Sequence, residues 1–175
     1  MKPTLLGSEI VHANPWYKVR HDKLRWVNGQ PGNYFVMDTA NTAIVLAIKD
    51  GNIMVVRQYR HTIDKYMLEF PGGSVQEGKS PLDAAKQELR EEAGLEAERW
   101  TKLGEVQVMS GLSTMKMHVF LAGDFTNVPV EREASEESLE HQWMPIEEWN
   151  QSIKDGSSND SESLAAWTLY LATQN

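Results

Sequence analysis

One helix, at residues 81–93, constrains the fold more than any other feature of the sequence. Ser80 can cap its first turn, and Pro81 stands at the first helical position, where a missing N–H costs nothing. Asp83 completes a variant of the capping box, and Gly94 is placed to end the helix. Because the signals at both ends agree, the sequence predicts a helix with defined bounds. Its apolar residues share one stripe, which predicts a core-facing side: Leu82, Ala85, Leu89 and Ala93.

The same helix carries an acidic cluster beside its apolar stripe. Glu88, Glu91 and Glu92 are spaced i, i+3 and i+4, so their like charges repel. They also lie in the last turns, where the helix dipole disfavours anions by a few tenths of a kcal/mol to ~1 kcal/mol. Bound Mg²⁺ or Mn²⁺ would relieve this, because these hard cations take carboxylate oxygens and leave room for substrate phosphates. A solvated acidic face is the alternative, and the cluster alone leaves both open.

The surrounding segment, residues 72–95, is GGSVQEGKSPLDAAKQELREEAGL, and it resembles the Nudix box. That pattern is Gly, five residues, Glu, seven residues, then Arg-Glu-aliphatic-x-Glu-Glu-x-Gly-aliphatic. Seven of the nine defined positions match: Gly73, Glu88, Leu89, Glu91, Glu92, Gly94 and Leu95. The flanking Glu69-Phe70-Pro71-Gly72 also looks like the family. The predicted loop and helix supply the structural context that the motif requires.

Two positions depart from the family pattern. Lys79 stands where the family has its first Glu, and Gln87 stands where it has Arg. In the family these two side chains brace the loop and orient the helix glutamates. Both have changed together, which predicts a rewired brace. Weakened or lost catalysis is the alternative.

The resemblance implies a metal-dependent diphosphatase. Glu88 and Glu92 would be the principal metal ligands, Glu91 a ligand or the partner of a base, and the Gly72 carbonyl a further ligand. Glycine at 72 and 73 suits close backbone approach to an ion and unusual φ values. Metal ions neutralise a diphosphate, orient it and acidify a bound water.

Relatives that act on ADP-ribose use a loop glutamate as base or metal ligand near the segment 131–140. By that resemblance Glu137 is the first candidate and Glu136 the second, with a flexible acidic loop of no catalytic role as the alternative.

Substrate binding is predicted at the basic end of a strand, 56–61. Arg60, with Arg57 beside it, resembles the arginine that ADP-ribose pyrophosphatases use for substrate, and it could pair with a phosphate in a forked geometry. Glu69, in the flanking segment that looks like the family, is a further substrate-binding candidate. A surface arginine without a binding role is the alternative for Arg60.

Strand patterns surround the helix, and two further helices end the chain. The strands are predicted at 16–27, 33–37, 42–48, 53–58, 102–109, 116–122 and 141–144, and the helices at 146–153 and 161–172. This order predicts an α/β (α+β) architecture, a mixed sheet covered by helices. The resemblance implies the Nudix fold, with an N-terminal β-hairpin extension at 1–38 that forms a homodimer and a Nudix domain at 39–175.

Composition and charge exclude several classes of protein. A net charge of −8 argues against a nucleic-acid partner, and the absence of cysteine excludes a disulfide framework or a thiolate site. No secretory signal or membrane-spanning run is visible, so a cytoplasmic protein without a membrane partner is expected.

The resemblance predicts ADP-ribose as substrate, and Ser110, where that branch tends to have proline, keeps open GDP-mannose or another nucleotide sugar. The remaining alternative is a Nudix-fold module that binds such a ligand without cleaving it.

Overall fold

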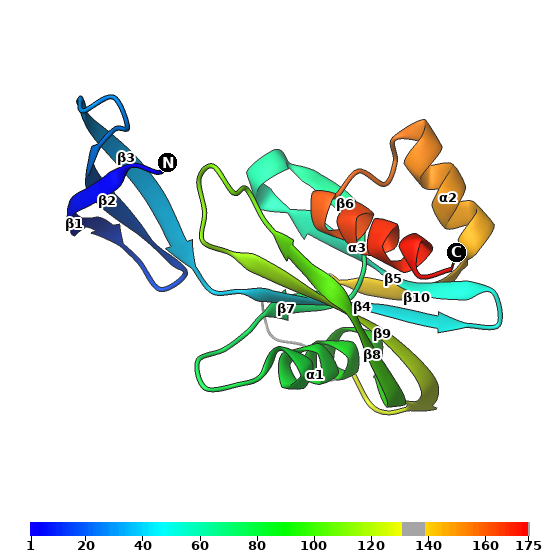
Figure 1. The fold of residues 1–175 in the computed structure, drawn as a ribbon. Coiled ribbons are helices and arrows are strands. Elements are labelled where there is room, and N and C mark those ends of the chain that lie inside the picture. The colour runs from blue at the N-terminus through cyan, green and yellow to red at the C-terminus, as the bar shows by residue number, and fades with distance from the viewer. Residues whose placement is uncertain (131–138, 175) are drawn as a thin grey trace. The chain divides into compact units, whose positions relative to one another are not determined.

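The computed structural model describes residues 1–130 and 139–174. The chain forms two compact units (Figure 1). One combines Met1–Asn41 with Gln107–Lys116, and the other combines Thr42–Val106 with Met117–Asn175. Among the described residues, no helix has both the length and the apolarity needed to cross a membrane.

The first unit is a three-stranded antiparallel sheet in the order β1 (Thr4–Ala13), β2 (Tyr17–Arg25) and β3 (Pro31–Thr39). The predicted hairpin corresponds to β2 and β3. β1 is an additional strand, and nine of its ten residues are exposed, so no buried face left a pattern in its sequence. The loop between β8 (Leu95–Gln107) and β9 (Lys116–Asn127) also belongs to this unit. In this loop, Leu112 O accepts a 2.8 Å hydrogen bond from Met37 N.

The second unit is built on a seven-stranded mixed sheet. Its elements are β4 (Thr42–Lys49), β5 (Asn52–Arg60), a 3-10 turn η1 (His61–Ile63), β6 (Lys65–Glu69), β7 (Gly72–Ser74), α1 (Pro81–Ala93), β8 (Leu95–Gln107), β9 (Lys116–Asn127), β10 (Glu140–Pro145), α2 (Ile146–Asp155) and α3 (Ser161–Ala172). The main strand order is β10-β5-β4-β9-β8, with β6 beside β5 and β7 beside β4. β4 and β9 run parallel, and β4 is antiparallel to β5 and β7. The predicted mixed sheet and its helices are confirmed.

Helices cover both faces of this sheet (Figure 1): α1 lies on one face, and α2 and α3 lie on the other. β4 packs against both α1 and α3, and residues 43–47 are all buried. A strand covered on both faces is apolar along its length rather than alternating, which explains the continuous hydrophobic run.

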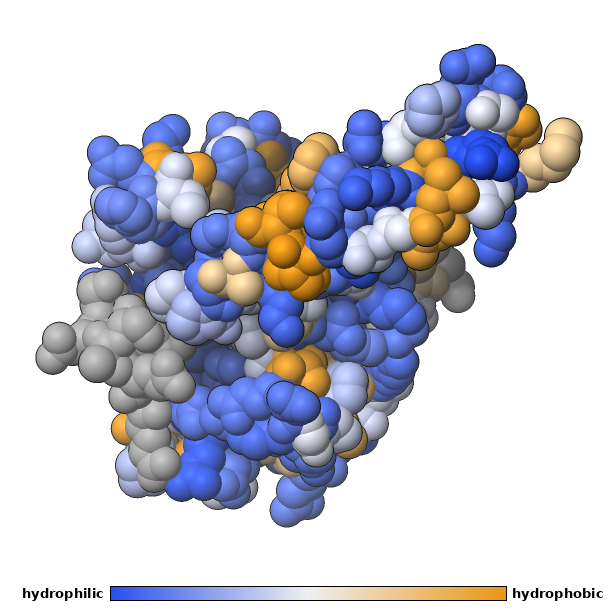
Figure 2. Space-filling model, turned by 90° about the vertical axis from the view of Figure 1, so that its left-hand side faces the viewer, coloured by the Kyte–Doolittle hydropathy of each residue, from blue (hydrophilic) through white to orange (hydrophobic). Residues whose placement is uncertain are grey.

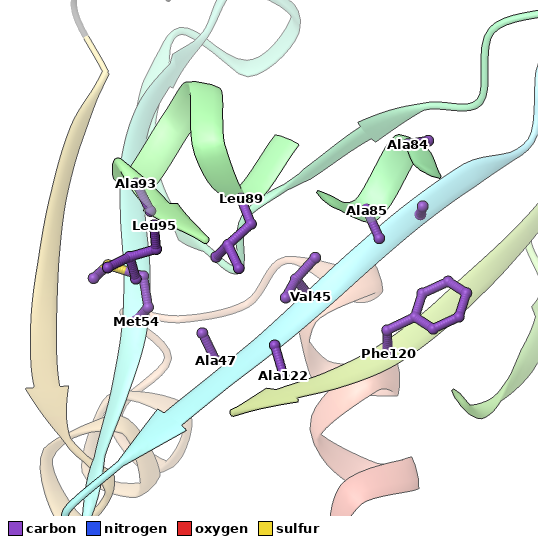
Figure 3. Close-up of a cluster of buried hydrophobic side chains, with 11 residues drawn as sticks. Val45, Ala47, Met54, Ala84, Ala85, Leu89, Ala93, Leu95, Phe120 and Ala122 are labelled. Carbon is purple, nitrogen blue, oxygen red and sulfur yellow. The ribbon is translucent and has the colours of Figure 1, made fainter. Parts of the chain in front are cut away.

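α1 has the bounds that its capping signals predict. The hydroxyl of Ser80 accepts a 3.1 Å hydrogen bond from Asp83 N, and Gly94 ends the helix with a φ of 61°. Its inner face is made of small residues around Leu89 and packs on β4, as Figure 3 shows. The alanines at 85 and 93 bring the helix backbone close to the sheet, and Leu89 fills the remaining space with no exposed surface.

Replacing this central side chain should weaken the whole second unit. Leu89→Ala removes a fully buried side chain and leaves a cavity between α1 and β4, which should cost about 2–5 kcal/mol of unfolding free energy. Urea denaturation measures the loss. Lys86→Ala, at an exposed position of the same helix, is the control and should change stability by less than ~0.5 kcal/mol.

Candidate metal and diphosphate site

The three α1 glutamates have different surroundings. Glu92 is only 3% exposed, and its Oε2 accepts a 2.9 Å hydrogen bond from the backbone N–H of Gly72. A buried carboxylate needs such partners because its desolvation is costly. The helical spacing placed Glu92 beside the apolar stripe, with a solvated acidic face as the alternative. Glu92 lies at the edge of the buried face and reaches β7, so the solvated alternative is wrong for this residue.

Glu88 also reaches β7. A Cβ on Gly73 would overlap the Glu88 carboxylate, and a Cβ on Gly72 would overlap the carbonyl oxygen of Ala43 and the side chain of Ile44. β7 is therefore squeezed between α1 and β4. Neither glycine has a positive φ, so the expectation of unusual φ values was wrong and close approach alone explains them.

Glu91 is oriented by the two residues that depart from the family pattern. Lys79 Nζ donates a 2.5 Å hydrogen bond to Gln87 Oε1, and Gln87 Nε2 donates a 2.9 Å hydrogen bond to Glu91 Oε1. Gln87 and Glu91 are one turn apart, at i and i+4. The expected brace is present as a continuous chain of hydrogen bonds from the loop to the helix.

These residues fit a divalent cation. In the described part of the chain, no three His, Cys, Asp or Glu side chains are grouped closely enough to hold a metal ion by themselves. Two carboxylates, those of Glu88 and Glu92, nevertheless meet the Gly72–Gly73 backbone in a cradle that a side chain at 73 would fill. Carboxylate and backbone oxygens are the hard donors that Mg²⁺ and Mn²⁺ take.

A cavity of about 420 Å³ opens beside this cradle. The residues that line it include Arg60, Glu69, Gly72, Gly73, Asp160 and Glu162. They come from β5, β6, β7 and the start of α3, so the cavity joins the glycine cradle to a strongly charged wall.

Arg60 and Glu69 form a forked ion pair in this wall. Arg60 Nε donates a 2.8 Å hydrogen bond to Glu69 Oε1, and Arg60 Nη2 donates to Glu69 Oε2. The Glu69 hydrogen bond raises the pKa of Arg60 above its ordinary value, against the opposing effect of burial, and Asp160 and Glu92 add attraction. Glu69 is 8% exposed in its side chain and Arg60 is 46% exposed, so the buried carboxylate holds an arginine whose third corner, Nη1, points away from the pair.

Arg57 lies elsewhere. Its Nη1 is 3.4 Å from Glu140 Oε2, and its Cζ lies 4.0 Å from the ring centroid of Tyr66. Side chains alternate along a strand, so positions 57 and 60 of β5 face opposite ways. Of the two predicted arginines, the structure brings only Arg60 to the cavity. Glu136 and Glu137, the predicted loop residues, lie outside the described residues.

The sequence predicts a helix at 161–172, which is α3, but it did not place the start of this helix in the site. Asp160 accepts a 2.7 Å hydrogen bond from Ser163 N and caps the helix, and Glu162 Oε2 accepts a 3.3 Å hydrogen bond from Thr42. Burial raises the pKa of Glu162, and the charge of Asp160 raises it further. The capping sequence marked the helix start, but no local signal showed that this end docks beside β7, because docking depends on distant residues.

Comparisons with known proteins agree with this geometry. A family model described as the NUDIX domain matches residues 37–167, and one described as the nucleoside diphosphate sugar hydrolase N-terminal domain matches residues 4–37. The chain therefore belongs to the Nudix family of hydrolases. Enzymes of this family generally require a divalent cation.

Individual relatives match most of the chain. The ADP-ribose pyrophosphatase of Mycobacterium tuberculosis (strain ATCC 25618 / H37Rv) is 31% identical over 91% of this chain and 79% of that protein. The ADP compounds hydrolase NudE of Escherichia coli (strain K12) is 26% identical over 96% of this chain and 91% of that protein. A crystal structure of an ADP compounds hydrolase superposes with a TM-score of 0.88 at 26% identity, covering 100% of this chain and 97% of that one. The expected Nudix fold is confirmed.

The raised pKa of Glu162 predicts a pH-dependent stability. Below the ordinary carboxyl pKa of about 4.3, both the folded and the unfolded chain hold the proton. As the pH rises past that value, the unfolded chain releases its proton while the folded chain retains it, so this residue lowers stability. Glu162→Gln should therefore be more stable than the parent at pH 7, and the difference should vanish near about pH 4. Urea denaturation at both pH values, with the exposed Glu98→Gln as control, tests this; an equal difference at both would contradict it.

Proposed function

We propose that this chain hydrolyses the diphosphate bond of a nucleoside diphosphate derivative, with ADP-ribose as the preferred substrate and Mg²⁺ or Mn²⁺ as the metal. The products are a nucleoside monophosphate and a sugar phosphate. The observation that carries the proposal is the cradle of Glu88, Glu92 and the Gly72–Gly73 backbone at the mouth of a cavity containing Arg60. The names of the relatives from Mycobacterium and Escherichia support the choice of an ADP compound.

Each residue of the site has a separate task in this proposal. Glu88 and Glu92 hold the cation, which supplies charge neutralisation and an acidified water when bound. Arg60, fixed by Glu69 through Nε and Nη2, offers Nη1 to a phosphate oxygen. Glu91 serves as a further ligand or the partner of a base, with Glu137, or else Glu136, as the base itself.

A nucleotide sugar such as GDP-mannose is the second candidate substrate. Two observations favour it. Ser110 stands where the ADP-ribose branch tends to have proline, and the family model that matches residues 4–37 is described as the N-terminal domain of a nucleoside diphosphate sugar hydrolase. A ligand-binding module without activity is less well supported, because the hydrogen bonds from Lys79 to Gln87 and on to Glu91 keep the third glutamate oriented.

The metal site is tested with Glu92→Gln. The amide oxygen can still accept the Gly72 N–H and one negative charge is lost from an acidic face, so the fold should remain intact. Loss of a metal ligand removes several kcal/mol of transition-state stabilisation, which corresponds to a fall in turnover on the order of 100-fold or more. Release of nucleoside monophosphate from ADP-ribose, GDP-mannose and other nucleotide sugars, with Mg²⁺ or Mn²⁺, measures it.

Glu148→Gln, at an exposed position of α2, is the matched control and should retain parental turnover. Equal activity of Glu92→Gln and the parent at the same metal concentration would contradict the assignment of Glu92. Absence of product from the parent across the whole panel would contradict hydrolysis and favour the binding module.

The homodimer predicted from the N-terminal extension forms the second part of the proposal. All residues of the first unit belong to the described part of the chain, and none of their hydrophobic side chains is buried. The large exposed ones are Met1, Leu5, Leu6, Ile10, Val11, Trp16, Tyr17, Val27, Tyr34, Phe35, Met109 and Leu112. Figure 2 shows such apolar patches among hydrophilic residues on one face of the molecule. A small sheet is stable only when an apolar face is covered, and we assign a second copy of the chain as its cover.

The basic residues of this extension bear on the same proposal. Arg20, Lys23 and Arg25 are the basic residues of strand β2 that could offer cations to a diphosphate. Arg20 is paired with Asp22 and Asp38, at 2.9 Å each, and Lys23 is paired with Glu9 at 3.4 Å. Arg25 is therefore the remaining candidate.

Light scattering on the intact chain should give twice the protomer mass of 19.8 kDa at micromolar concentrations. A chain lacking residues 1–38 should be monomeric and should lose activity, because the extension also contributes to substrate binding. A fully active monomer of the intact chain would rule out the dimer.

A further inference from the structure

We propose that Lys79 and Gln87 are positioning residues: the Lys79 ammonium sets which way the Gln87 amide faces, and the amide then fixes the Glu91 carboxylate. This inference deepens the proposed hydrolysis and rests on it. It concerns the two residues at which this chain departs from the family pattern, and it explains why they depart together.

The direction of the amide follows from which groups can donate. An ammonium has only donors and a carboxylate has only acceptors, while an amide has one of each kind of end. The bonds of 2.5 Å from Lys79 Nζ to Gln87 Oε1 and 2.9 Å from Gln87 Nε2 to Glu91 Oε1 give every donor in this series an acceptor. The flipped amide would set donors against Lys79 and an acceptor against Glu91. The charges at the two ends therefore select one orientation.

Both ends of this chain of hydrogen bonds are anchored independently. Lys79 lies in a turn closed by its own N–H, which donates a 3.1 Å hydrogen bond to Gln76 O, and the next residue is the helix cap Ser80. Gln87 and Glu91 are on α1, which Leu89 holds against the sheet. The Gln87 side chain thus links this hydrogen-bonded turn to a helix packed against the sheet.

Glu91 needs this partner because β7 does not supply one. The carboxylates of Glu92 and Glu88 lie against the Gly72–Gly73 backbone, whereas Gln87 is the hydrogen-bond partner of Glu91 Oε1. A carboxylate on a half-buried helix turn can still adopt several rotamers. The amide bond restricts Glu91 to one of them, ready to act as ligand or base partner.

The family pattern performs the same task with opposite charges. There Glu occupies position 79 and Arg occupies position 87, so charges alternate along the series to Glu91. Either single exchange breaks the alternation. Gln87→Arg places two cations, Lys79 and the new guanidinium, side by side. Lys79→Glu offers the Gln87 amide an acceptor, so the amide donors turn toward position 79 and the amide oxygen turns toward Glu91. The double exchange restores a complete series.

The first experiment uses no turnover. Side-chain amide resonances of the ¹⁵N-labelled, metal-free full-length chain report whether the Gln87 NH₂ is held. Slow hydrogen exchange at Gln87 is expected in the parent and should become fast in Lys79→Glu and Lys79→Met. Gln107, whose Nε2 donates a 2.9 Å hydrogen bond to Met115 O, is the internal control and should not change. Gln87 exchange that is the same in all three proteins would overturn the proposal.

The second experiment is a double-mutant cycle on kcat and KM. Lys79→Glu and Gln87→Arg should each lower kcat by about tenfold with little change in KM, because the bound substrate is not contacted. The double variant should recover to within about threefold of the parent, which is strong coupling. Lys86→Glu, the same charge change at an exposed position of α1, should retain parental kcat.

The outcomes separate the two proposals. Additive effects in an active parent would overturn the positioning role and leave the hydrolase intact. If the parent is inactive toward every substrate, the proposed function fails, while the loss of Gln87 protection in Lys79→Glu would still support the positioning role. Denaturation curves accompany each variant, and Lys79→Met keeps the test decisive if Lys79→Glu does not fold.

Discussion

The close approach of β7 to α1 on one side and to β4 on the other controls the geometry of the site. Gly72 and Gly73 leave room for the Ala43 carbonyl and for the Glu88 carboxylate, and only that spacing lets Gly72 N–H reach Glu92. A helix displaced outward by the size of a methyl group would take the Glu92 carboxylate away from this donor. A buried carboxylate that loses a partner costs more free energy than the bond contributes net. The alanines that bring α1 close to the sheet are thus as necessary to the site as the glutamates.

The electrostatics of the cavity follow from the same crowding. Glu69, Asp160 and Glu162 surround Arg60, and the two α1 glutamates at the glycine cradle add further negative charge. One arginine does not offset this number of carboxylates, so a diphosphate alone would be repelled. A divalent cation held by Glu88 and Glu92 would supply the positive charge that offsets these carboxylates toward a diphosphate. The negative charge of the cavity wall therefore gives a physical reason for the divalent cation that enzymes of this family generally require.

Local signals in the sequence were sufficient for some elements and not for others. α1 was predictable because Ser80, Pro81 and Gly94 act on their own neighbours. β1 was not, because an exposed strand has no hydrophobic alternation. The burial of Glu92 and Glu162 was hidden for another reason: burial of a charged residue depends on which distant backbone or side chain approaches it. Gly72 and Gly73 were expected for close backbone approach and for unusual φ values, and the structure supports only the close approach.

Lys79 and Gln87 differ from the family motif in residue type, yet they form a continuous series of hydrogen bonds. Position by position, the chain has two mismatches in a motif of nine defined residues. In the structure these two residues form one continuous series of donors and acceptors that ends on Glu91. Position 87 must supply a hydrogen-bond donor to Glu91. An amide supplies this donor when a cation binds its oxygen, and a guanidinium supplies it when an anion binds its other side. The identity of each residue can change provided that the polarity of its neighbour changes with it.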